Sequence, residues 1–384
     1  MKIAHITMFF SPTFCGVGQV AYELAIRQVK EGNEVHVFCC DSDKNKRIEL
    51  KEEILDGIHV HRLPYWLRLS LTTFLWPSLL WKLKGKFDII HTHGAGHDYV
   101  LFAGLLCKLN GAKHIHTTHC PWTDTSFRPK IVRPFLILNN LFMNRFSFKL
   151  VDKIIAITPW ELEILKKYVG EEKIKVIPNG VDKILYQKIK NNKFRKKNKI
   201  KEKYLVLFFG RLNPTKGPEM LAKTAVNITK KRKDIAFVWV GPDEGKAEEV
   251  SKLIKDYPNM KWLGPLKGKE KIAEMYQSAD VYVLPSYREG LPLTLFEAMA
   301  SGIPIVASPV NGVPYEMKEN ENGLFSDYGD LVSIERNILQ LINNKRLAEK
   351  ISKSNLKKSK DYNWDDIYHK YMKEYRCLLN LHKS

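Results

Sequence analysis

Strand-like runs that alternate with helical segments are the feature that most constrains the fold of this 384-residue chain. Short apolar runs predict strands, and segments with an apolar residue every three or four positions predict helices between them. Such alternation is typical of parallel sheets that carry helices on both faces. In the first half the predicted strands are 2–9, 35–40, 88–91, 113–118, 153–158 and 175–177, with a helix over 18–31.

The same alternation starts again in the second half of the chain. Its predicted strands are 204–209, 235–240, 260–263, 281–284 and 303–307, and its predicted helices are 218–232, 244–255, 269–277 and 292–301. A chain of this length has room for about two domains. We therefore predict two doubly wound α/β domains, 1–182 and 204–363, joined by the segment 183–203.

The joining segment 183–203 contains ten basic residues and one acid, in a chain whose formal net charge is +20. A solvated linker explains this composition. A patch for anionic lipid headgroups or for a polyanionic acceptor explains it as well, because clustered Lys and Arg attract such surfaces. Nucleic acid is not expected as a partner, because the chain shows no zinc-finger spacing, no RNA-binding aromatic motif and no clear helix-turn-helix.

Two apolar stretches with basic flanks, 65–86 and 130–149, are candidates for contact with a membrane. Basic residues beside Trp, Phe and Leu suit a helix that lies in the membrane interface, and a helix packed on the sheet has the same composition. No stretch is suited to span a bilayer. The first residues lack a signal-peptide cleavage pattern, and the six cysteines show no CxxC pair. We expect a cytoplasmic protein with free thiols, peripheral on the cytoplasmic face of the membrane if it binds lipid.

The first motif with chemical content is Gly16-Val17-Gly18, between the first predicted strand and helix. Two glycines allow backbone N–H groups to approach an anion at the helix N-terminus. The run 16–21 also matches the dinucleotide fingerprint GxGxxG/A, and Asp41 follows at the end of the next strand, where a ribose-binding acid would lie. An NAD-dependent oxidoreductase is therefore one alternative function.

The second motif places Arg211 and Lys216 in the loop after the first strand of the second half. Ligands bind at the carboxyl ends of strands in open α/β sheets. Two cations five residues apart in such a loop suit a pyrophosphate.

The third motif is the run from Glu289 to Glu297, which follows the strand 281–284. It puts one acid in a loop and the other in the first part of the next helix. Carboxylates bind sugar hydroxyls, and the free N–H groups of a helix start bind phosphate. The backbone of the intervening residues is part of this candidate site: Gly290, Leu291, Pro292, Leu293 and Thr294.

Taken in order along the chain, these motifs resemble the retaining nucleotide-sugar glycosyltransferases of family 4. The segments that carry the resemblance are 16–18, 118–119, 178–182, 210–217, 289–307 and 322–324. The resemblance covers nearly the whole chain and implies the GT-B fold, in which two Rossmann-like domains face each other across a cleft. It also implies that a tail helix within 364–384 returns to the first domain.

The resemblance implies catalytic roles for His119, Arg211, Lys216 and Glu289. Arg211 and Lys216 would hold the donor diphosphate, and Glu289 would bind the transferred sugar. Two further groups would complete the site: Glu297 on the ribose, and the backbone of Gly16, Val17 and Gly18 near the phosphate or sugar. His119 would lie by the sugar, although Cys120 stands where the family commonly has Gly.

The expected function is transfer of a hexose from a UDP- or GDP-sugar to a hydroxyl of a lipid-linked or polysaccharide glycan. The resemblance points to chemistry without a cofactor and without a metal. A zinc site among the histidines is a rival interpretation, but His114 and His116 share one face of a strand rather than a helix with ligand spacing. A non-catalytic binder of anionic membranes is a second alternative to the transferase.

Overall fold

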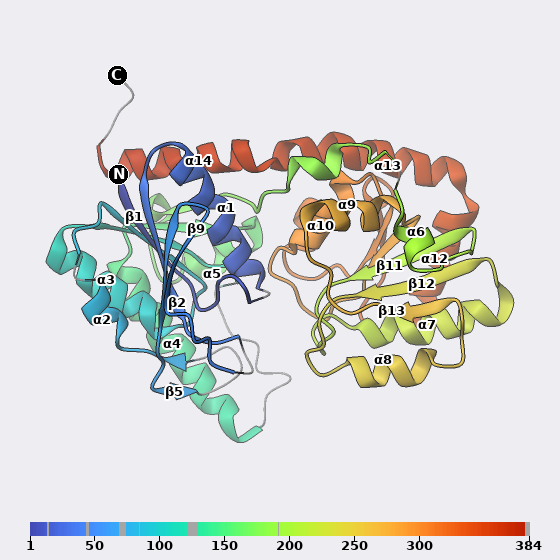
Figure 1. The fold of residues 1–384 in the computed structure, drawn as a ribbon, viewed down its shortest axis with the longest axis horizontal. Coiled ribbons are helices and arrows are strands. Elements are labelled where there is room, and N and C mark those ends of the chain that lie inside the picture. Colours follow the sequence, from blue (N-terminus) through green and yellow to red (C-terminus); the bar gives the residue numbers. More distant parts are fainter. Residues whose placement is uncertain are drawn as a thin grey trace. The chain divides into compact units, whose positions relative to one another are not determined.

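The computed structural model describes residues 1–13, 15–43, 46–68, 74–83, 85–120, 130–190 and 192–380. The chain forms two compact units, coloured in chain order in Figure 1. The first unit comprises Met1–Asn179 together with Asp365–Ser384, and the second comprises Gly180–Trp364.

The first unit is built on an eight-stranded sheet with the order β10-β9-β8-β7-β1-β2-β4-β3. Neighbouring strands are parallel except for β3, which runs antiparallel to β4. The strands are β1 (Lys2–Ile6), β2 (Glu34–Cys40), β3 (Glu52–Leu55), β4 (Ile58–Leu63), β7 (Ile89–His93), β8 (Lys113–Thr117), β9 (Lys153–Ala156) and β10 (Ile174–Val176). A separate antiparallel pair is formed by β5 (Leu67–Arg68) and β6 (Phe74–Leu75).

Helices of the first unit are α1 (Gly16–Lys30), α2 (Leu79–Lys82), α3 (Asp98–Asn110), α4 (Arg133–Leu150), α5 (Leu162–Leu165) and the tail helix α14 (Trp364–Leu378). The tail helix packs on this unit through an apolar stripe that includes Ile367, Tyr371 and Tyr375, all fully or nearly fully buried. The Tyr375 hydroxyl lies 2.6 Å from Nδ1 of His91 in β7.

The second unit has a six-stranded sheet, all parallel, with the order β13-β12-β11-β14-β15-β16. Its strands are β11 (Tyr204–Phe209), β12 (Ile235–Val240), β13 (Met260–Trp262), β14 (Val281–Leu284), β15 (Ile305–Ala307) and β16 (Gly323–Phe325). Its helices are α6 (Phe194–Lys197), α7 (Pro218–Lys231), α8 (Ala247–Ile254), α9 (Lys269–Gln277), α10 (Leu293–Ala300), α11 (Val313–Glu316), α12 (Leu331–Asn343) and α13 (Lys345–Ser359). Every residue of β12 is buried, as expected for a strand covered on both faces.

The predicted fold class, two parallel-sheet α/β domains, is confirmed. Each predicted strand is present within a few residues of its predicted bounds. The sequence pattern missed β3, β4, β5, β6 and β16. The last of these has only three residues and follows a turn rich in Asn and Glu, so it gives too short an apolar run to be recognised.

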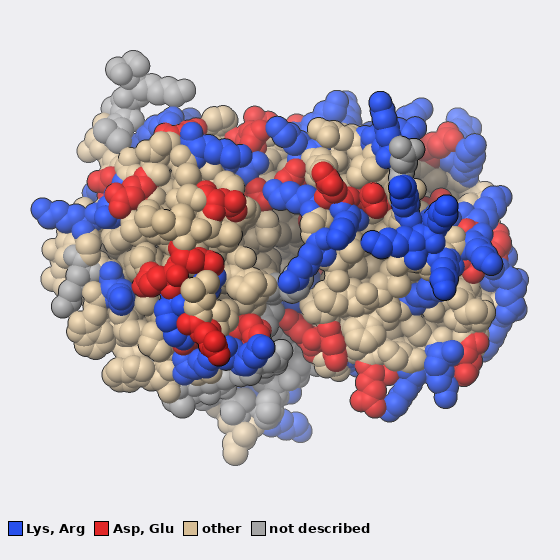
Figure 2. All heavy atoms as spheres, in the orientation of Figure 1, with Lys and Arg blue, Asp and Glu red and all other residues tan. Residues whose placement is uncertain are grey.

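The basic segment 183–203 is packed within the second unit. Phe194 and Ile200 are buried, and Nη2 of Arg195 lies 2.7 Å from Oδ2 of Asp280. Figure 2 shows Lys and Arg side chains gathered over the face that carries α6. The apolar residues therefore fix the segment on the unit, while most of its basic side chains extend into solvent.

Gly18 lies in the first turn of α1, where the helix approaches the chain after β1. A Cβ atom at this position would lie 2.4 Å from the carbonyl oxygen of Phe9, a distance that two unbonded atoms do not tolerate. Gly18 is thus explained by the close approach of helix and backbone, whatever ligand binds here.

Gly18→Ala should lower the free energy of unfolding by about 1–3 kcal/mol, since the methyl group must displace backbone rather than a flexible side chain. Thermal unfolding without any nucleotide measures the effect. Gly16→Ala is the matched control, because Gly16 is exposed at the start of the same helix and Ala favours helix there. Equal stability of Gly18→Ala and Gly16→Ala would contradict the packing explanation.

Candidate active site

The candidate site of the second unit lies where the order of its strands reverses. β11 is flanked by β12 on one side and by β14 on the other. The connections that leave β11 and β14 therefore diverge, and a crevice is expected at their carboxyl ends. The loop 210–217 follows β11 and the loop 285–292 follows β14, so the two sequence motifs with charged residues meet at this point.

Backbone hydrogen bonds join the loops at this edge of the sheet. The N–H of Tyr287 donates to the carbonyl of Thr215 at 2.9 Å, and the N–H of Glu244 donates to the carbonyl of Leu212 at 3.0 Å. Gly217 makes the approach possible: its φ is +61°, and a Cβ there would lie 2.2 Å from the carbonyl oxygen of Pro285. The loops after β11, β12 and β14 are thereby held together.

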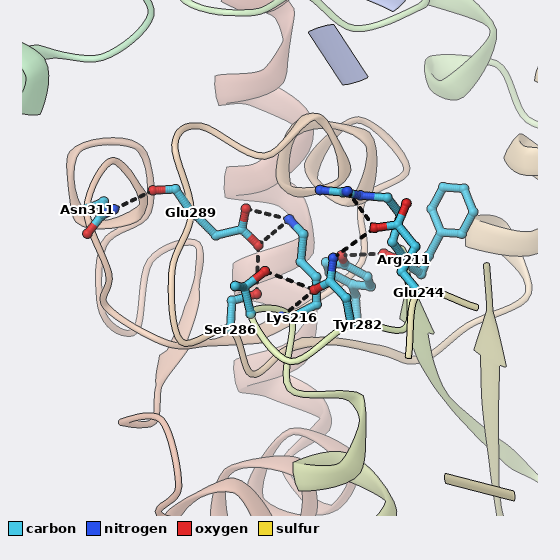
Figure 3. A network of polar contacts seen from close by, with 10 residues as sticks. Arg211, Lys216, Glu244, Tyr282, Ser286, Glu289 and Asn311 are labelled. Carbon is cyan, nitrogen blue, oxygen red and sulfur yellow. Dashed lines mark hydrogen bonds and ion pairs between the residues drawn. The ribbon is translucent and has the colours of Figure 1, made fainter. Parts of the chain in front are cut away.

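Lys216 and Glu289 form the centre of the polar network in Figure 3. Nζ of Lys216 lies 2.6 and 2.5 Å from the two carboxylate oxygens of Glu289, and Ser286 Oγ donates to the same carboxylate at 2.6 Å. The side chain of Asn311, after β15, donates to the carbonyl of Glu289 at 2.6 Å. Because the Glu289 side chain is 4% exposed, these partners replace the hydrogen bonds that water would otherwise make with its carboxylate.

Arg211 is held by a carboxylate that the sequence motifs did not single out. Its Nη1 lies 2.7 Å from Oε2 of Glu244, which also accepts from Nδ2 of Asn213 at 3.2 Å. The amide oxygen of Asn213 accepts from the backbone N–H of Lys216 at 3.1 Å, so Asn213 connects the two cations. Glu244, Asn213, Ser286 and Asn311 come from four loops, and no spacing in the sequence indicates that they meet.

Glu297 lies in α10 beside a second polar group. Its carboxylate accepts from the Tyr276 hydroxyl at 2.9 Å. Burial raises its pKa to about 7, Tyr276 acts against the rise, and the charge of Asp182 adds to it. Burial also raises the pKa of Tyr282, and both Glu289 and Glu297 contribute to that rise. The charges of both acids of the third motif thus raise the pKa of the same tyrosine.

In the first unit, His119 and Cys120 form a turn directly after β8. Both have positive φ, +50° and +99°, a region that favours glycine. This conformation is a physical reason for a glycine at position 120, and here Cys occupies it. The buried carboxylate of Glu161 holds the turn, since it accepts from Thr118 Oγ1 at 2.5 Å and from the N–H of Cys120 at 3.1 Å.

Glu161 is a functional candidate that the sequence reasoning missed. Burial raises its pKa to about 7. The signal in the sequence is Thr158-x-x-Glu161, the pattern of a capping box, and Thr158 does cap the short helical turn Pro159–Glu161. That pattern predicts a helix start, but the contact with the turn at 118–120 requires the strand order.

Within the described part of the chain, a group of histidines in the first unit has the spacing that could hold a metal ion. Ring nitrogens of His5, His91 and His93 lie within 4.8 Å of one another. Each of their six ring nitrogens already has a hydrogen-bond partner in the protein. The cluster is therefore satisfied as a hydrogen-bond network within the protein.

The fingerprint for a dinucleotide lacks its structural context. β1 ends at Ile6 and α1 begins at Gly16, whereas the fingerprint requires its first glycine directly after the strand. Both carboxylate oxygens of Asp41 are engaged, with Arg47 Nη1 at 2.5 Å and Lys51 Nζ at 2.7 Å. The structure gives no support to the oxidoreductase alternative.

Two family models match the chain and define its class. "Glycosyltransferase Family 4" matches residues 14–183, and "Glycosyl transferases group 1" matches residues 189–358. With the two parallel-sheet units, these matches define a glycosyltransferase of the GT-B fold. The chain belongs to the family 4 type of these enzymes, as its sequence motifs predicted. These matches give no support to the alternative of a non-catalytic membrane binder.

Relatives with curated names are transferases. The chain is 28% identical over 368 residues to the UDP-Gal:alpha-D-GlcNAc-diphosphoundecaprenol alpha-1,3-galactosyltransferase of Escherichia coli, covering 90% of this chain and 89% of the relative. It is 24% identical to the phosphatidylinositol N-acetylglucosaminyltransferase GPI3 subunit of Saccharomyces cerevisiae, covering 95% and 80%.

Solved structures share the fold at low identity. Sucrose-phosphate synthase from Thermosynechococcus elongatus superposes with a TM-score of 0.79 at 21% identity, covering 99% of this chain and all of that one. Anabaena Alr3699/HepE in complex with UDP-glucose gives 0.77 at 18% identity, covering 97% and 99%.

The raised pKa of Glu297 predicts a stability that falls with rising pH. The unfolded chain releases this proton near pH 4.5, whereas the folded protein keeps it until about pH 7. The free energy of unfolding therefore decreases between these values and then levels off. Glu297→Gln should match the wild type near pH 4.5 and exceed its stability at pH 8 by about 3 kcal/mol.

Thermal unfolding of both proteins across this pH range measures the difference. Glu270→Gln, at an exposed position of α9, is the control and should follow the wild-type curve. A constant difference between Glu297→Gln and the wild type at all pH values would contradict the assigned pKa.

Proposed function

We propose that this enzyme transfers a hexose from a UDP- or GDP-sugar to a hydroxyl of a lipid-linked or polysaccharide glycan, with retention of configuration. The network of Arg211, Lys216 and Glu289 at the switch point of the second unit carries the proposal. It combines two cations suited to a diphosphate with a carboxylate suited to sugar hydroxyls.

The donor diphosphate would bind against Arg211 and Lys216. The negative charge on the leaving phosphate grows as the glycosidic bond breaks, and cations already in position stabilise it. Glu244 and Glu289 hold the two side chains in place before the donor arrives. These cations would supply the charge that a divalent metal supplies elsewhere, so the proposal includes no metal and no cofactor.

The remaining groups would hold the sugar and the nucleoside. Glu289 would accept hydrogen bonds from the transferred sugar, and Glu297 from the ribose. Between them, α10 begins at Leu293, and the N–H groups of its first turn have no acceptor within the helix. Backbone N–H groups in the run 290–294 would bind the phosphate or the sugar there.

The first unit would bind the acceptor and place His119 by the sugar. Burial lowers the pKa of His119 to about 3, so its ring is neutral near pH 7 and acts by hydrogen bonds. The backbone around Gly16, Val17 and Gly18, at the start of α1, would approach the phosphate or the sugar.

Retention would follow from attack on the face that the phosphate leaves. The bond from the anomeric carbon to the phosphate oxygen breaks, and a bond from the same carbon to the acceptor oxygen forms on that face. The acceptor proton passes to the departing phosphate oxygen, so no protein nucleophile is needed. The printed name of the Escherichia coli relative, with a UDP-sugar donor and a diphosphoundecaprenol acceptor, supports this donor class and a lipid-linked acceptor.

The surface of α4 favours action at an anionic membrane. Ile137, Leu138, Leu141, Phe142 and Phe146 are each between 50% and 54% exposed, whereas the polar side chains of Asn144 and Ser147 are buried. The helix thus turns apolar side chains outward, and exposed Arg145 and Lys149 lie beside them. Apolar and basic side chains on one helix are typical of contact with anionic lipid.

The other apolar stretch, 65–86, is divided between core and surface. Trp76, Leu79 and Leu83 are fully buried, whereas Trp66 and Trp81 are 69% and 57% exposed. Residues 69–73 and 84 of this stretch lie outside the described part of the chain. Among the residues that the structure describes, no helix is long and apolar enough to cross a bilayer. We therefore propose peripheral association, on the cytoplasmic face.

Arg211→Ala and Lys216→Ala should each lower turnover by about 10²-fold or more, because each removes a cation from the leaving phosphate. Donor binding can be screened by thermal shift with UDP-, GDP- and ADP-sugars, since a ligand of the folded state raises the unfolding temperature. A wild-type shift with a UDP- or GDP-sugar, diminished in both variants, is expected. Lys223→Ala, on α7 away from these loops, is the control. Unchanged turnover in both variants would refute the diphosphate site.

The double variant Leu141→Asp/Phe142→Asp should bind vesicles of phosphatidylglycerol and phosphatidylcholine at least about tenfold more weakly than the wild type, because a membrane interface does not accept carboxylates readily. Vesicle sedimentation measures this. Val332→Asp in α12, another exposed apolar position, is the control and should bind as the wild type does. Equal binding by the double variant would exclude α4 as the contact.

A further inference from the structure

A chain of hydrogen bonds runs through the interior of the first unit and ends at His119. Oε1 of Gln28 in α1 lies 2.7 Å from Nε2 of His5 in β1. Nδ1 of His5 lies 2.9 Å from Nε2 of His93 in β7, and Nδ1 of His93 lies 3.3 Å from Nε2 of His119. Gln28, His5 and His93 are fully buried, so water cannot replace these contacts.

The strand register produces this row. His5 pairs with His91 across β1 and β7, and His93 is two residues further along, on the same face. His93 in turn pairs with Thr117 of β8, and His119 follows two residues later. His5, His93 and His119 therefore lie on β1, on β7 and just after β8, each nearer than the last to the carboxyl ends of the strands.

The row has a direction, because a carbonyl oxygen can only accept. The Gln28 amide is assigned with Oε1 toward His5, and in this orientation Nε2 of His5 carries a hydrogen and Nδ1 of His5 accepts from Nε2–H of His93. Nδ1 of His93 is then an acceptor in turn, so Nε2 of His119 carries the hydrogen between these two rings. Each step assumes a ring with one hydrogen, and burial lowers the pKa of His5 to about 4, that of His119 to about 3 and that of His93 well below its usual value.

We propose that Gln28, His5 and His93 are positioning residues that fix His119 as the Nε2–H tautomer. Nδ1 of His119 is then a bare acceptor, and its ligand is a hydroxyl group of the sugar. This last step rests on the proposed function, whereas the tautomer rests on the hydrogen bonds alone. Gln28 lies at the other end of the row, three hydrogen bonds from His119. Its side chain thus decides which hydrogen bond His119 can make.

Nitrogen-15 NMR of histidine-labelled protein tests the tautomer, because protonated and bare ring nitrogens have well-separated shifts. In the wild type, His5, His93 and His119 should each carry hydrogen on Nε2. Gln28→Met removes the final acceptor and should convert His119 to a mixture of tautomers. It should also lower kcat/KM for the donor by about tenfold, the cost of one misdirected hydrogen bond. Gln28→Glu keeps an acceptor oxygen and should retain the wild-type tautomer.

Gln19→Met, at an exposed position of the same helix, is the control and should leave the His119 signals unchanged. Hydrogen on Nδ1 of wild-type His119 would overturn the proposal, even if Gln28→Met fails to fold. An unchanged His119 signal in folded Gln28→Met would overturn it as well. Absence of transferase activity with an Nε2–H tautomer would instead refute the proposed function.

Discussion

The ion pair between Lys216 and Glu289 is the interaction on which the second unit's site depends. Its partners follow adjacent strands, β11 and β14, and both side chains are sheltered from water. A sheltered charge without a partner is strongly destabilising, so each group requires the other. The pair can form only because Gly217 permits the two loops to touch. Strand order, one glycine and one ion pair thus place the cations and the carboxylate together.

The same geometric rule shapes the polar interior of the first unit. The strand order of its sheet also reverses at β1, which lies between β2 and β7. Polar side chains on the inner face of β1 and β7 cannot reach water, so they must satisfy one another. His5 and His93 do so, and the network they form ends at the turn that Glu161 holds.

The basic segment 183–203 and the exposed apolar side chains of α4 belong to different units. The second unit carries the basic segment 183–203 on its face, fixed by buried Phe194 and Ile200. The first unit carries α4, whose apolar side chains are exposed while Asn144 and Ser147 are buried. Phe148 of the same helix is buried in the core, so α4 has a packed side as well as an exposed apolar one. Such an exposed apolar surface is expected to have a partner of its own.

The sequence by itself determined the class of fold and most of the chemistry. The spacing of apolar residues and the length of apolar runs depend on neighbouring residues, so they indicated the strands and helices. The ends of the predicted strands then indicated the loops that contain Arg211, Lys216 and Glu289. Only the tertiary structure decided which loops meet. Three contacts join residues that are separated by dozens of positions: Glu244 with Arg211, Glu161 with Cys120, and His5 with His93. The order in which the strands pair brings them together. That order is set by the packing of whole sheets, which no local pattern of residues records.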